Sequence, residues 1–218
     1  MSVRVKICGL CDAETIRAMD GLPVDEIGFV LAKSRRQVSP AQAGELIDAV
    51  ASLRNHNGVA PRTVGVFVDP TLESLEETIA TAPLDVIQLH GEETPQLCRD
   101  VRDRLGRDVW KVLSVGEQHE DATSRLAPYA GAIDAVLIDT AGGGTGQTFQ
   151  WDRIPAYAAA AQELGLPLYV AGGLHPGNVQ ELLRSYAPGG IDVSSGVETD
   201  GVKDIGLIKQ FIERVKEA

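Results

Sequence analysis

The 218-residue sequence has few cysteines, few aromatic residues and no long apolar run. Its three cysteines, Cys8, Cys11 and Cys98, form an odd and sparse set, which argues against a disulfide framework. No stretch approaches the roughly 20 apolar residues that a membrane-spanning helix needs. The chain begins directly with a strand pattern and no secretory leader precedes it, so we expect a cytoplasmic protein that does not enter a membrane.

Positive charge is also scarce. Lysine and arginine total 20 against 31 acidic residues, which gives a net charge of -11. This balance argues against nucleic acid or an anionic membrane surface as the main partner. A small anionic substrate stays possible, because a local cluster of cations can oppose the global charge. The polar segment that carries Lys33, Arg35 and Arg36 is such a cluster, although a solvated basic loop would look the same.

Short apolar runs alternate with amphipathic stretches along the whole chain. Strands are predicted near residues 3–8, 26–31, 63–68, 85–89, 109–113, 134–139, 167–171 and 190–194. Helices are predicted near residues 12–20, 40–53, 71–81, 93–105, 121–128, 151–164, 176–186 and 203–217. Many of the strand segments are continuous apolar runs, which is typical of parallel strands covered by helices on both faces.

Eight strand–helix units in a chain of this length match the lower size range of a closed (β/α)8 barrel. An open, doubly wound sheet is the alternative, but it would usually place a glycine fingerprint after the first strand. The segment Cys8-Gly9-Leu10-Cys11 is not such a fingerprint. No linker or break in composition marks a second domain. We therefore predict an α/β fold, a single (β/α)8 TIM-barrel domain over residues 1–218.

Reactive groups in such a barrel collect where the strands end. Cys8 ends the first strand, and Lys6 shares its face because alternate residues of a strand point the same way. An ammonium beside a thiol favours the thiolate, although a lone cysteine is more often a buried filler. Gln88 and His90 end the fourth strand, and Asp139 ends the sixth, where an unpaired carboxylate would be costly.

The seventh and eighth strands both run out into glycine-containing turns. The first turn carries Gly172 and Gly173 and leads toward a helix expected to start near Pro176, and the second carries Ser195 and Gly196. Glycine lets main-chain N–H groups approach an anion, and helix N-termini add a favourable dipole. Each segment alone is compatible with a plain tight turn. Together they predict a phosphorylated small-molecule ligand, because phosphate sites in these barrels often lie after strands seven and eight.

Two motifs resemble known binding or redox sites but lack residues that those sites require. Residues 141–148 look like a phosphate-binding P-loop, but Gln147 stands where the lysine should precede Thr148, so we interpret the segment as a mobile loop over the site. Cys8 and Cys11 form a single Cys-x-x-Cys pair. A zinc site would require a second pair of ligands at a suitable spacing, so we expect no metal site. A redox pair would require a thioredoxin-like unit, which the predicted barrel does not provide.

Six segments carry a resemblance to a known family, and they occur in the family's order from one end of the chain to the other. They are Lys6-Ile7-Cys8-Gly9-Leu10, Ser34-Arg35-Arg36-Gln37-Val38-Ser39, Gln88-Leu89-His90-Gly91, Gly143-Gly144-Thr145-Gly146-Gln147-Thr148-Phe149-Gln150-Trp151, Ala171-Gly172-Gly173-Leu174 and Asp192-Val193-Ser194-Ser195-Gly196-Val197-Glu198. The chain resembles phosphoribosylanthranilate isomerase of tryptophan biosynthesis. The resemblance implies a (β/α)8 barrel that converts N-(5'-phosphoribosyl)anthranilate to 1-(2-carboxyphenylamino)-1-deoxyribulose 5-phosphate without a cofactor.

The resemblance also implies roles for single residues. The cysteine of the family's Lys-Ile-Cys-Gly motif is its base, which is Cys8 here, and the aspartate that ends the sixth strand is its acid, which is Asp139 here. The family's arginine after the second strand falls on Arg36. Two neighbours depart from the pattern, because Arg35 stands where a proline is common and Gln37 where an aromatic residue is common. These departures concern substrate packing.

These residues support an Amadori rearrangement. Asp139 would open the ribose ring by protonating its oxygen, and Cys8, as thiolate, would take the C2' proton. We expect a water-poor site to raise the pKa of Asp139 and Lys6 to lower that of Cys8. Arg36 would hold the anthranilate carboxylate, and Asp192 would orient the substrate amine or pair with cations of the inner face. Main-chain groups of the seventh and eighth strand ends would hold the phosphate.

Three alternative functions are also compatible with parts of the sequence. The histidine-pathway isomerase performs the same rearrangement, but paired aspartates on strands one and six would favour it, and Cys8 opposes that. A binding module would hold a phosphorylated metabolite without turning it over. A thiol-redox protein would form a disulfide between Cys8 and Cys11. The sequence leaves a monomer and a homodimer equally open.

Overall fold

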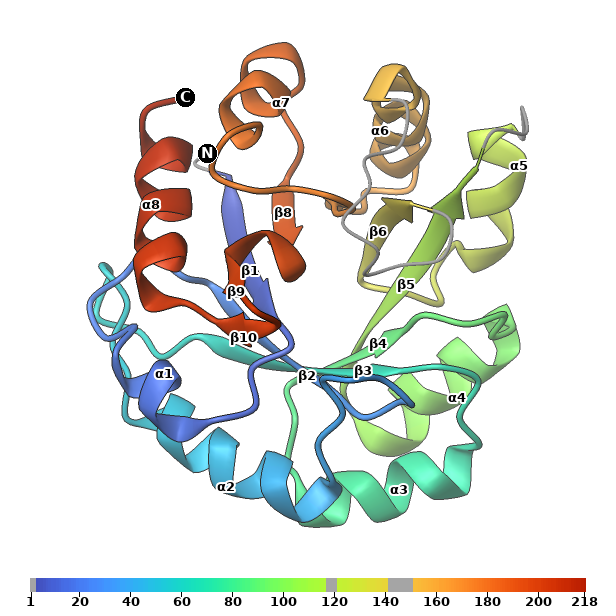
Figure 1. Cartoon of the computed structure of the whole chain (residues 1–218). Helices are drawn as coiled ribbons and strands as arrows, with labels where there is room; N and C mark the ends of the chain where they lie inside the picture. Colours follow the sequence, from blue (N-terminus) through green and yellow to red (C-terminus); the bar gives the residue numbers. More distant parts are fainter. Residues whose placement is uncertain (1–2, 117–120, 141–150) are drawn as a thin grey trace.

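The structure is a computed structural model that describes residues 3–116, 121–140 and 151–218. Its eight long strands form a closed parallel barrel in which each strand lies beside the next one in sequence, and the last pairs with the first. The helices lie outside the barrel (Figure 1). The predicted (β/α)8 barrel is confirmed. The predicted loop over residues 141–150 lies outside the described residues.

The barrel strands occupy the predicted segments. They are β1 (Arg4–Cys8), β2 (Glu26–Val30), β3 (Arg62–Phe67), β4 (Val86–Leu89), β5 (Asp108–Val115), β6 (Ala135–Thr140), β7 (Leu168–Val170) and β8 (Gly190–Val193). The helices are α1 (Ala13–Arg17), α2 (Pro40–Ala51), α3 (Leu72–Thr81), α4 (Pro95–Leu105), α5 (Ala122–Leu126), α6 (Ile154–Glu163), α7 (Val179–Ser185) and α8 (Ile205–Lys216). Short 3-10 turns cover Ala127–Tyr129, Trp151–Arg153 and Ser195–Val197. Among the described residues, no helix is long and apolar enough to cross a membrane.

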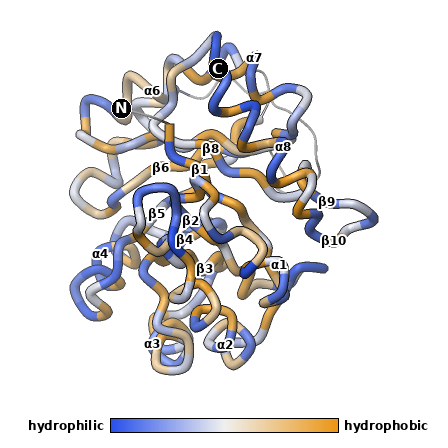
Figure 2. Tube along the Cα trace, turned by 90° about the vertical axis from the view of Figure 1, so that its left-hand side faces the viewer, coloured by the Kyte–Doolittle hydropathy of each residue, from blue (hydrophilic) through white to orange (hydrophobic). Residues whose placement is uncertain are grey.

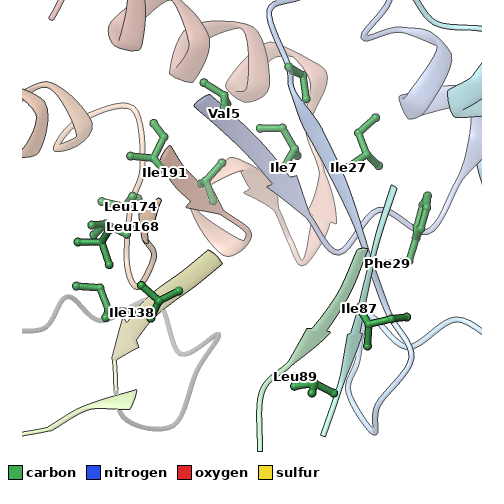
Figure 3. Packing of buried hydrophobic residues seen from close by; sticks show 14 of the residues in the cluster. Val5, Ile7, Ile27, Phe29, Ile87, Leu89, Ile138, Leu168, Leu174 and Ile191 are labelled. Carbon is green, nitrogen blue, oxygen red and sulfur yellow. The ribbon is translucent and has the colours of Figure 1, made fainter. Parts of the chain in front are cut away.

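Alternation along the strands divides the apolar residues into two cores. The larger core lies between the strands and the helices, where Ile7, Phe29 and Ile87 are among the residues that pack (Figure 3). The smaller core fills the barrel interior and includes Trp110 and Tyr169, whose ring centroids are 4.4 Å apart. Apolar side chains therefore fill much of the inner face, beside buried polar residues such as Lys6, Gln88 and Asp192.

Local capping explains where several helices begin. Ser39 caps α2 in a capping box with Gln42, and Pro40 occupies the first turn. The predicted seventh helix is present, but its expected start near Pro176 is wrong, because α7 begins at Val179. Residues 176–178 form a turn instead. His175 closes this turn locally: its Nδ1 accepts from Gly177 N, and its N–H donates to Asn178 Oδ1.

One element was not predicted. After β8 and a 3-10 turn, the chain forms an antiparallel hairpin of β9 (Glu198–Thr199) and β10 (Val202–Lys203) before α8 begins. The tip residues Asp200 and Gly201 both have positive φ, as a tight turn requires. The hairpin extends to one side of the barrel (Figure 2).

Candidate active site

A cavity of about 370 Å³ opens at the carboxyl ends of the barrel strands, a volume typical of small-molecule sites. It is lined by Cys8, Val30, Ala32, Lys33, Ser34, Arg36, Val66, Val68, Gln88, His90, Ser114, Asp139, Ala171, Gly172, Gly173, Leu174, Asp192, Ser194 and Ser195. The structure thus brings together most of the residues singled out from the sequence. The two that do not line the cavity are Lys6 and Gly196.

Lys6 lies one step deeper in the barrel than Cys8 and is fully buried. Its Nζ donates to Asp192 Oδ2 at 2.9 Å, which joins β1 to the neighbouring strand β8. The other carboxylate oxygen, Asp192 Oδ1, is buried and has no hydrogen-bond partner among the described residues. Such an acceptor is costly to leave unsatisfied, and it lies in the wall of the cavity. It is a ready acceptor for a ligand N–H or O–H.

The pKa of Cys8 differs from expectation. Burial raises the pKa of the Cys8 thiol, and the neighbouring Lys6 ammonium only partly offsets that effect. Lys6 thus acts in the expected direction, but the expected net lowering of the Cys8 pKa is wrong. The physical reason is burial, which disfavours the charged thiolate, and the negative charge of Asp192 adds a smaller rise. Burial also opposes the charge of Lys6, but Asp192 and Cys8 together outweigh it and raise the pKa of the ammonium.

Gly28 on β2 makes room for the thiol. A Cβ atom at this position would lie 2.8 Å from Cys8 Sγ and 3.2 Å from Lys6 Nζ. Any side chain would thus displace both groups. Sequence reasoning did not single out Gly28, although a glycine inside a strand often marks the close approach of another group.

The opposite wall carries the remaining polar side chains. His90 Nε2 lies 3.7 Å from Asp139 Oδ2, and both residues line the cavity. Burial lowers the pKa of the His90 imidazole and the Lys6 ammonium adds to the effect, so we take His90 to be neutral at pH 7. Gln88 is buried, and its Oε1 has no hydrogen-bond partner among the described residues. It is a second acceptor for a ligand.

The seventh and eighth strand ends meet at the rim. Gly172 and Gly173 have φ of +88° and +64°, and they line the cavity together with Ser195. The main-chain N–H groups of these three residues donate no hydrogen bond to another described residue. Gly196 does not line the cavity, and its role is in packing. A Cβ there would lie 1.8 Å from the carbonyl oxygen of Leu174, so this glycine lets the two turns pack against each other.

Arg36 is buried beside the cavity and forms a two-bond ion pair with Glu198 on the unpredicted hairpin. Sequence reasoning missed this partner. The available signal was a basic segment with no acidic residue beside it, in a chain rich in acids. A cluster of cations that enters a fold needs a counter-charge, and here it comes from the far end of the chain.

A second cavity, of about 530 Å³, lies at the opposite end of the barrel. It is lined by residues such as Val3, Val5 and Tyr186, and it contains none of the predicted site residues. Within the described ranges, no group of three or more His, Cys, Asp or Glu side chains is placed to hold a metal ion. The chemistry-bearing residues therefore converge on the first cavity.

Comparison with known proteins gives one consistent answer. Residues 5–214 match the family model described as N-(5'phosphoribosyl)anthranilate (PRA) isomerase. A protein of Brevibacillus brevis named N-(5'-phosphoribosyl)anthranilate isomerase is 48% identical over 217 residues, which cover 98% of this chain and 93% of that protein.

Solved structures agree. The phosphoribosyl anthranilate isomerase of Thermus thermophilus superposes with a TM-score of 0.82 at 31% identity and covers 99% of both chains. A phosphoribosyl anthranilate isomerase in complex with reduced 1-(o-carboxyphenylamino)-1-deoxyribulose 5-phosphate gives a TM-score of 0.78 at 33% identity. This match covers 99% of the present chain and 100% of the other.

Proposed function

Because the chain belongs to the N-(5'-phosphoribosyl)anthranilate isomerase family, we propose how the residues of its cavity divide the work of the family's reaction. The reaction belongs to tryptophan biosynthesis. It converts N-(5'-phosphoribosyl)anthranilate, an aldosylamine, to 1-(2-carboxyphenylamino)-1-deoxyribulose 5-phosphate, an aminoketose. Such an Amadori rearrangement needs one proton delivered to the ring oxygen of the sugar and one proton removed from C2'.

The substrate has two anionic ends, and the cavity has a matching group at each. The phosphate lies against the free main-chain N–H groups of Gly172, Gly173 and Ser195, supported by a rim that Gly196 allows to close. The anthranilate carboxylate lies at Arg36, whose planar fork suits a carboxylate. This placement leaves the ribose between the two ends, over Cys8 and Asp139.

The two unsatisfied acceptors fit the donors of that ribose and its amine. Asp192 Oδ1 accepts from the anilino N–H, and Gln88 Oε1 accepts from a ribose hydroxyl. His90, held neutral, lines the wall next to the acid. The first two contacts each satisfy a buried acceptor that has no partner among the described residues, so substrate binding offsets a cost of the site.

The first chemical step is ring opening. Asp139 donates a proton to the furanose oxygen, and the C1'–O bond breaks as the nitrogen lone pair forms the C1'=N Schiff base. The carboxyl group must hold its proton until the substrate is in place. Asp139 is buried in β6, where it lines the cavity.

The second step is removal of the C2' proton. The Cys8 thiolate takes it, and the electron pair moves into C1'=C2' while the Schiff base becomes an enolamine. The enolamine then tautomerises to the ketone product. Lys6 is the cation that lowers the pKa of Cys8 most, and it stabilises the thiolate against the cost of burial. Each positioned proton transfer supplies about 10²–10⁴-fold in rate.

One observation carries this proposal: a thiol and a carboxyl group from strands β1 and β6 line the same small cavity. The test is the loss of substrate fluorescence in the wild type and in the Cys8→Ser and Asp139→Asn variants. The proposal expects both variants to bind the product analogue and to lose turnover. Full activity in either variant would remove that residue from its role.

We also propose a location, a domain organisation and an oligomeric state for the enzyme. We place the chain in the cytoplasm, as a biosynthetic enzyme, and treat residues 1–218 as one barrel domain, because the family match spans β1 to α8. The chain acts as a monomer or a homodimer, and light scattering on the purified protein separates the two. A phosphoribosylantranilate isomerase of Thermotoga maritima is described as dimeric.

A further inference from the structure

Glu198 pairs with one edge of the Arg36 guanidinium. Glu198 Oε1 accepts from Arg36 Nε at 2.6 Å, and Glu198 Oε2 accepts from Arg36 Nη2 at 3.0 Å. This pairing occupies the side of the group that carries Nε–H. The guanidinium has five N–H donors, so its far edge, formed by Nη1 and the second N–H of Nη2, stays available. Nη1 donates no hydrogen bond to another described residue.

Glu198 is itself fixed from two sides. Its side chain is 3% exposed, and it accepts from Lys203 Nζ at 2.5 Å and from Arg35 Nη2 at 2.7 Å. Burial raises the pKa of Glu198, but the hydrogen bonds from Arg36 and Lys203 outweigh it and hold that pKa below its ordinary value. Glu198 is therefore a carboxylate at neutral pH, with no freedom to follow Arg36 if Arg36 moved.

The hairpin supplies the frame for this cluster. Glu198 opens β9 and Lys203 closes β10, and the two residues are paired directly across the ladder. Lys203 Nζ also donates to the carbonyl oxygen of Ser194 at 3.0 Å, which ties the hairpin to the end of β8. The stem of Arg36 is confined as well, because a Cβ at Gly9 would lie 2.5 Å from Arg36 Cδ. Stem and head are thus both immobilised.

The balance of charge favours an anion at this place. Three cations, Arg35, Arg36 and Lys203, surround one carboxylate, whereas the whole chain has a net charge of -11. A carboxylate on the far edge of Arg36 would meet a surplus of positive charge and a guanidinium that needs no reorganisation.

We propose that Glu198 is a positioning residue for substrate recognition, which aligns Arg36 so that its free edge selects the anthranilate carboxylate. This inference rests on the proposed function, since it takes the carboxylate to lie at Arg36. It adds the reason why the arginine discriminates. The β9–β10 hairpin, which lies outside the strand–helix repeat of the barrel, becomes part of the specificity of the site.

The experiment compares two ligands, the reduced product analogue and its counterpart without the ring carboxylate, titrated by calorimetry into the full-length protein. The Glu198→Gln variant keeps the size of the side chain and removes its charge. We expect it to weaken binding of the carboxylate ligand by about 10-fold, with the other ligand unchanged within about twofold. Glu198→Asp, which keeps the charge but shortens the reach, should give the same selective loss and stands in if the first variant does not fold.

Asp200→Asn is the matched control, because Asp200 lies on the same hairpin and asparagine tolerates its positive φ. It should bind both ligands as the wild type does. Equal weakening of both ligands by the Glu198 variants would show a merely structural role, and no weakening would show no role. Either result overturns the inference.

Arg36→Met separates this inference from the function beneath it. If the carboxylate lies at Arg36, this variant loses discrimination between the two ligands, and adding Glu198→Gln to it changes nothing further. Full discrimination in Arg36→Met would place the carboxylate elsewhere, and the proposed function would fail together with the inference. Lost discrimination in Arg36→Met but not in Glu198→Gln would overturn the inference alone.

Discussion

Two buried lysine–carboxylate pairs differ in how completely they are satisfied. Lys111 on β5 bonds Glu93 Oε2 at 2.8 Å and the carbonyl oxygen of Gly91 at 2.6 Å, while Glu93 Oε1 accepts from main-chain N–H groups. Lys6 donates to Asp192 Oδ2, and Asp192 Oδ1 has no partner among the described residues. The first pair closes a hydrogen-bond network. The second leaves capacity for a ligand, and only it borders the cavity.

Of these two pairs, the one whose bonding is incomplete is the one that borders the cavity. A pair that is fully bonded fixes the fold, as Lys111 and Glu93 fix the turn after β4. A pair with an unused acceptor stores a cost that a substrate can relieve. Variants that break one pair or the other should therefore have different effects, and variants at other buried groups extend the comparison.

The largest effect is expected at the acid of the site. Asp139→Asn removes the proton that opens the ribose ring, and we expect kcat to fall by about 10²–10⁴-fold. Turnover is followed by the loss of substrate fluorescence, and folding by the thermal transition. A variant that retains kcat within about threefold would mean that ring opening does not depend on this proton.

Breaking the closed pair should cost stability. Lys111→Met leaves Glu93 buried without its ammonium, so we expect the free energy of unfolding to fall by about 3–5 kcal/mol in denaturant titrations. The folded fraction should keep its kcat, because Lys111 does not line the cavity. A loss of kcat in fully folded protein would contradict the structural assignment of this pair.

Breaking the open pair should instead change the pH profile. Because burial raises the pKa of Cys8 and Lys6 offsets part of that rise, kcat/KM should increase with pH through the thiol ionisation. Lys6→Met removes the offset, so the inflection should move to higher pH and the rate at neutral pH should fall. A profile that rises through the same ionisation as the wild type would contradict the role of Lys6.

A third buried carboxylate sharpens the comparison through stability alone. Burial raises the pKa of Glu26 from 4.5 to about 7, even though Arg4 opposes the rise. Between these two values the folded state holds a proton that the unfolded state has lost, so stability falls as pH rises through this window. Glu26→Gln should remove that fall, which amounts to at most about 3 kcal/mol. Denaturant titrations at pH 4.5 and 7.5 measure it; an unchanged slope would contradict the account.

The smallest effect concerns space near the sulfur. Gly28→Ala adds a Cβ atom that would lie 2.8 Å from Cys8 Sγ, so the thiol must shift. We expect kcat to fall by about 10-fold with binding of the product analogue preserved, since a small misplacement of a reacting group slows turnover. Gly206→Ala, in the first turn of α8 and far from the sulfur, is the matched control and should keep wild-type kcat.

Much of the fold could be predicted because each strand–helix unit carries its own periodic signal. The eight strands follow from apolar runs, and the start of α2 follows from Ser39 and Pro40. Boundaries that depend on local side-chain bonds were not predictable in the same way. The turn after His175 delays α7 to Val179, because His175 and Asn178 bond the main chain themselves.

The cavity residues could be predicted from one topological fact, that the strand ends of a parallel barrel meet. Long-range partners could not. Glu198 lies 162 positions from Arg36 in sequence, and no periodicity links them. The sign of the Cys8 shift was also beyond sequence reasoning. Lys6 was visible as a neighbour on the strand, but the compensating charge of Asp192 and the depth of burial appear only in three dimensions.

The most direct test of the account follows one hydrogen, the one at C2' of the ribose. Single-turnover rates are measured with the ordinary substrate and with substrate deuterated at C2', in the wild type and in Cys8→Ser. The account predicts a rate at least about 100-fold lower in the variant, with affinity for the product analogue unchanged within about threefold. Wild-type turnover by Cys8→Ser would contradict it, because the proton would then leave C2' without the sulfur.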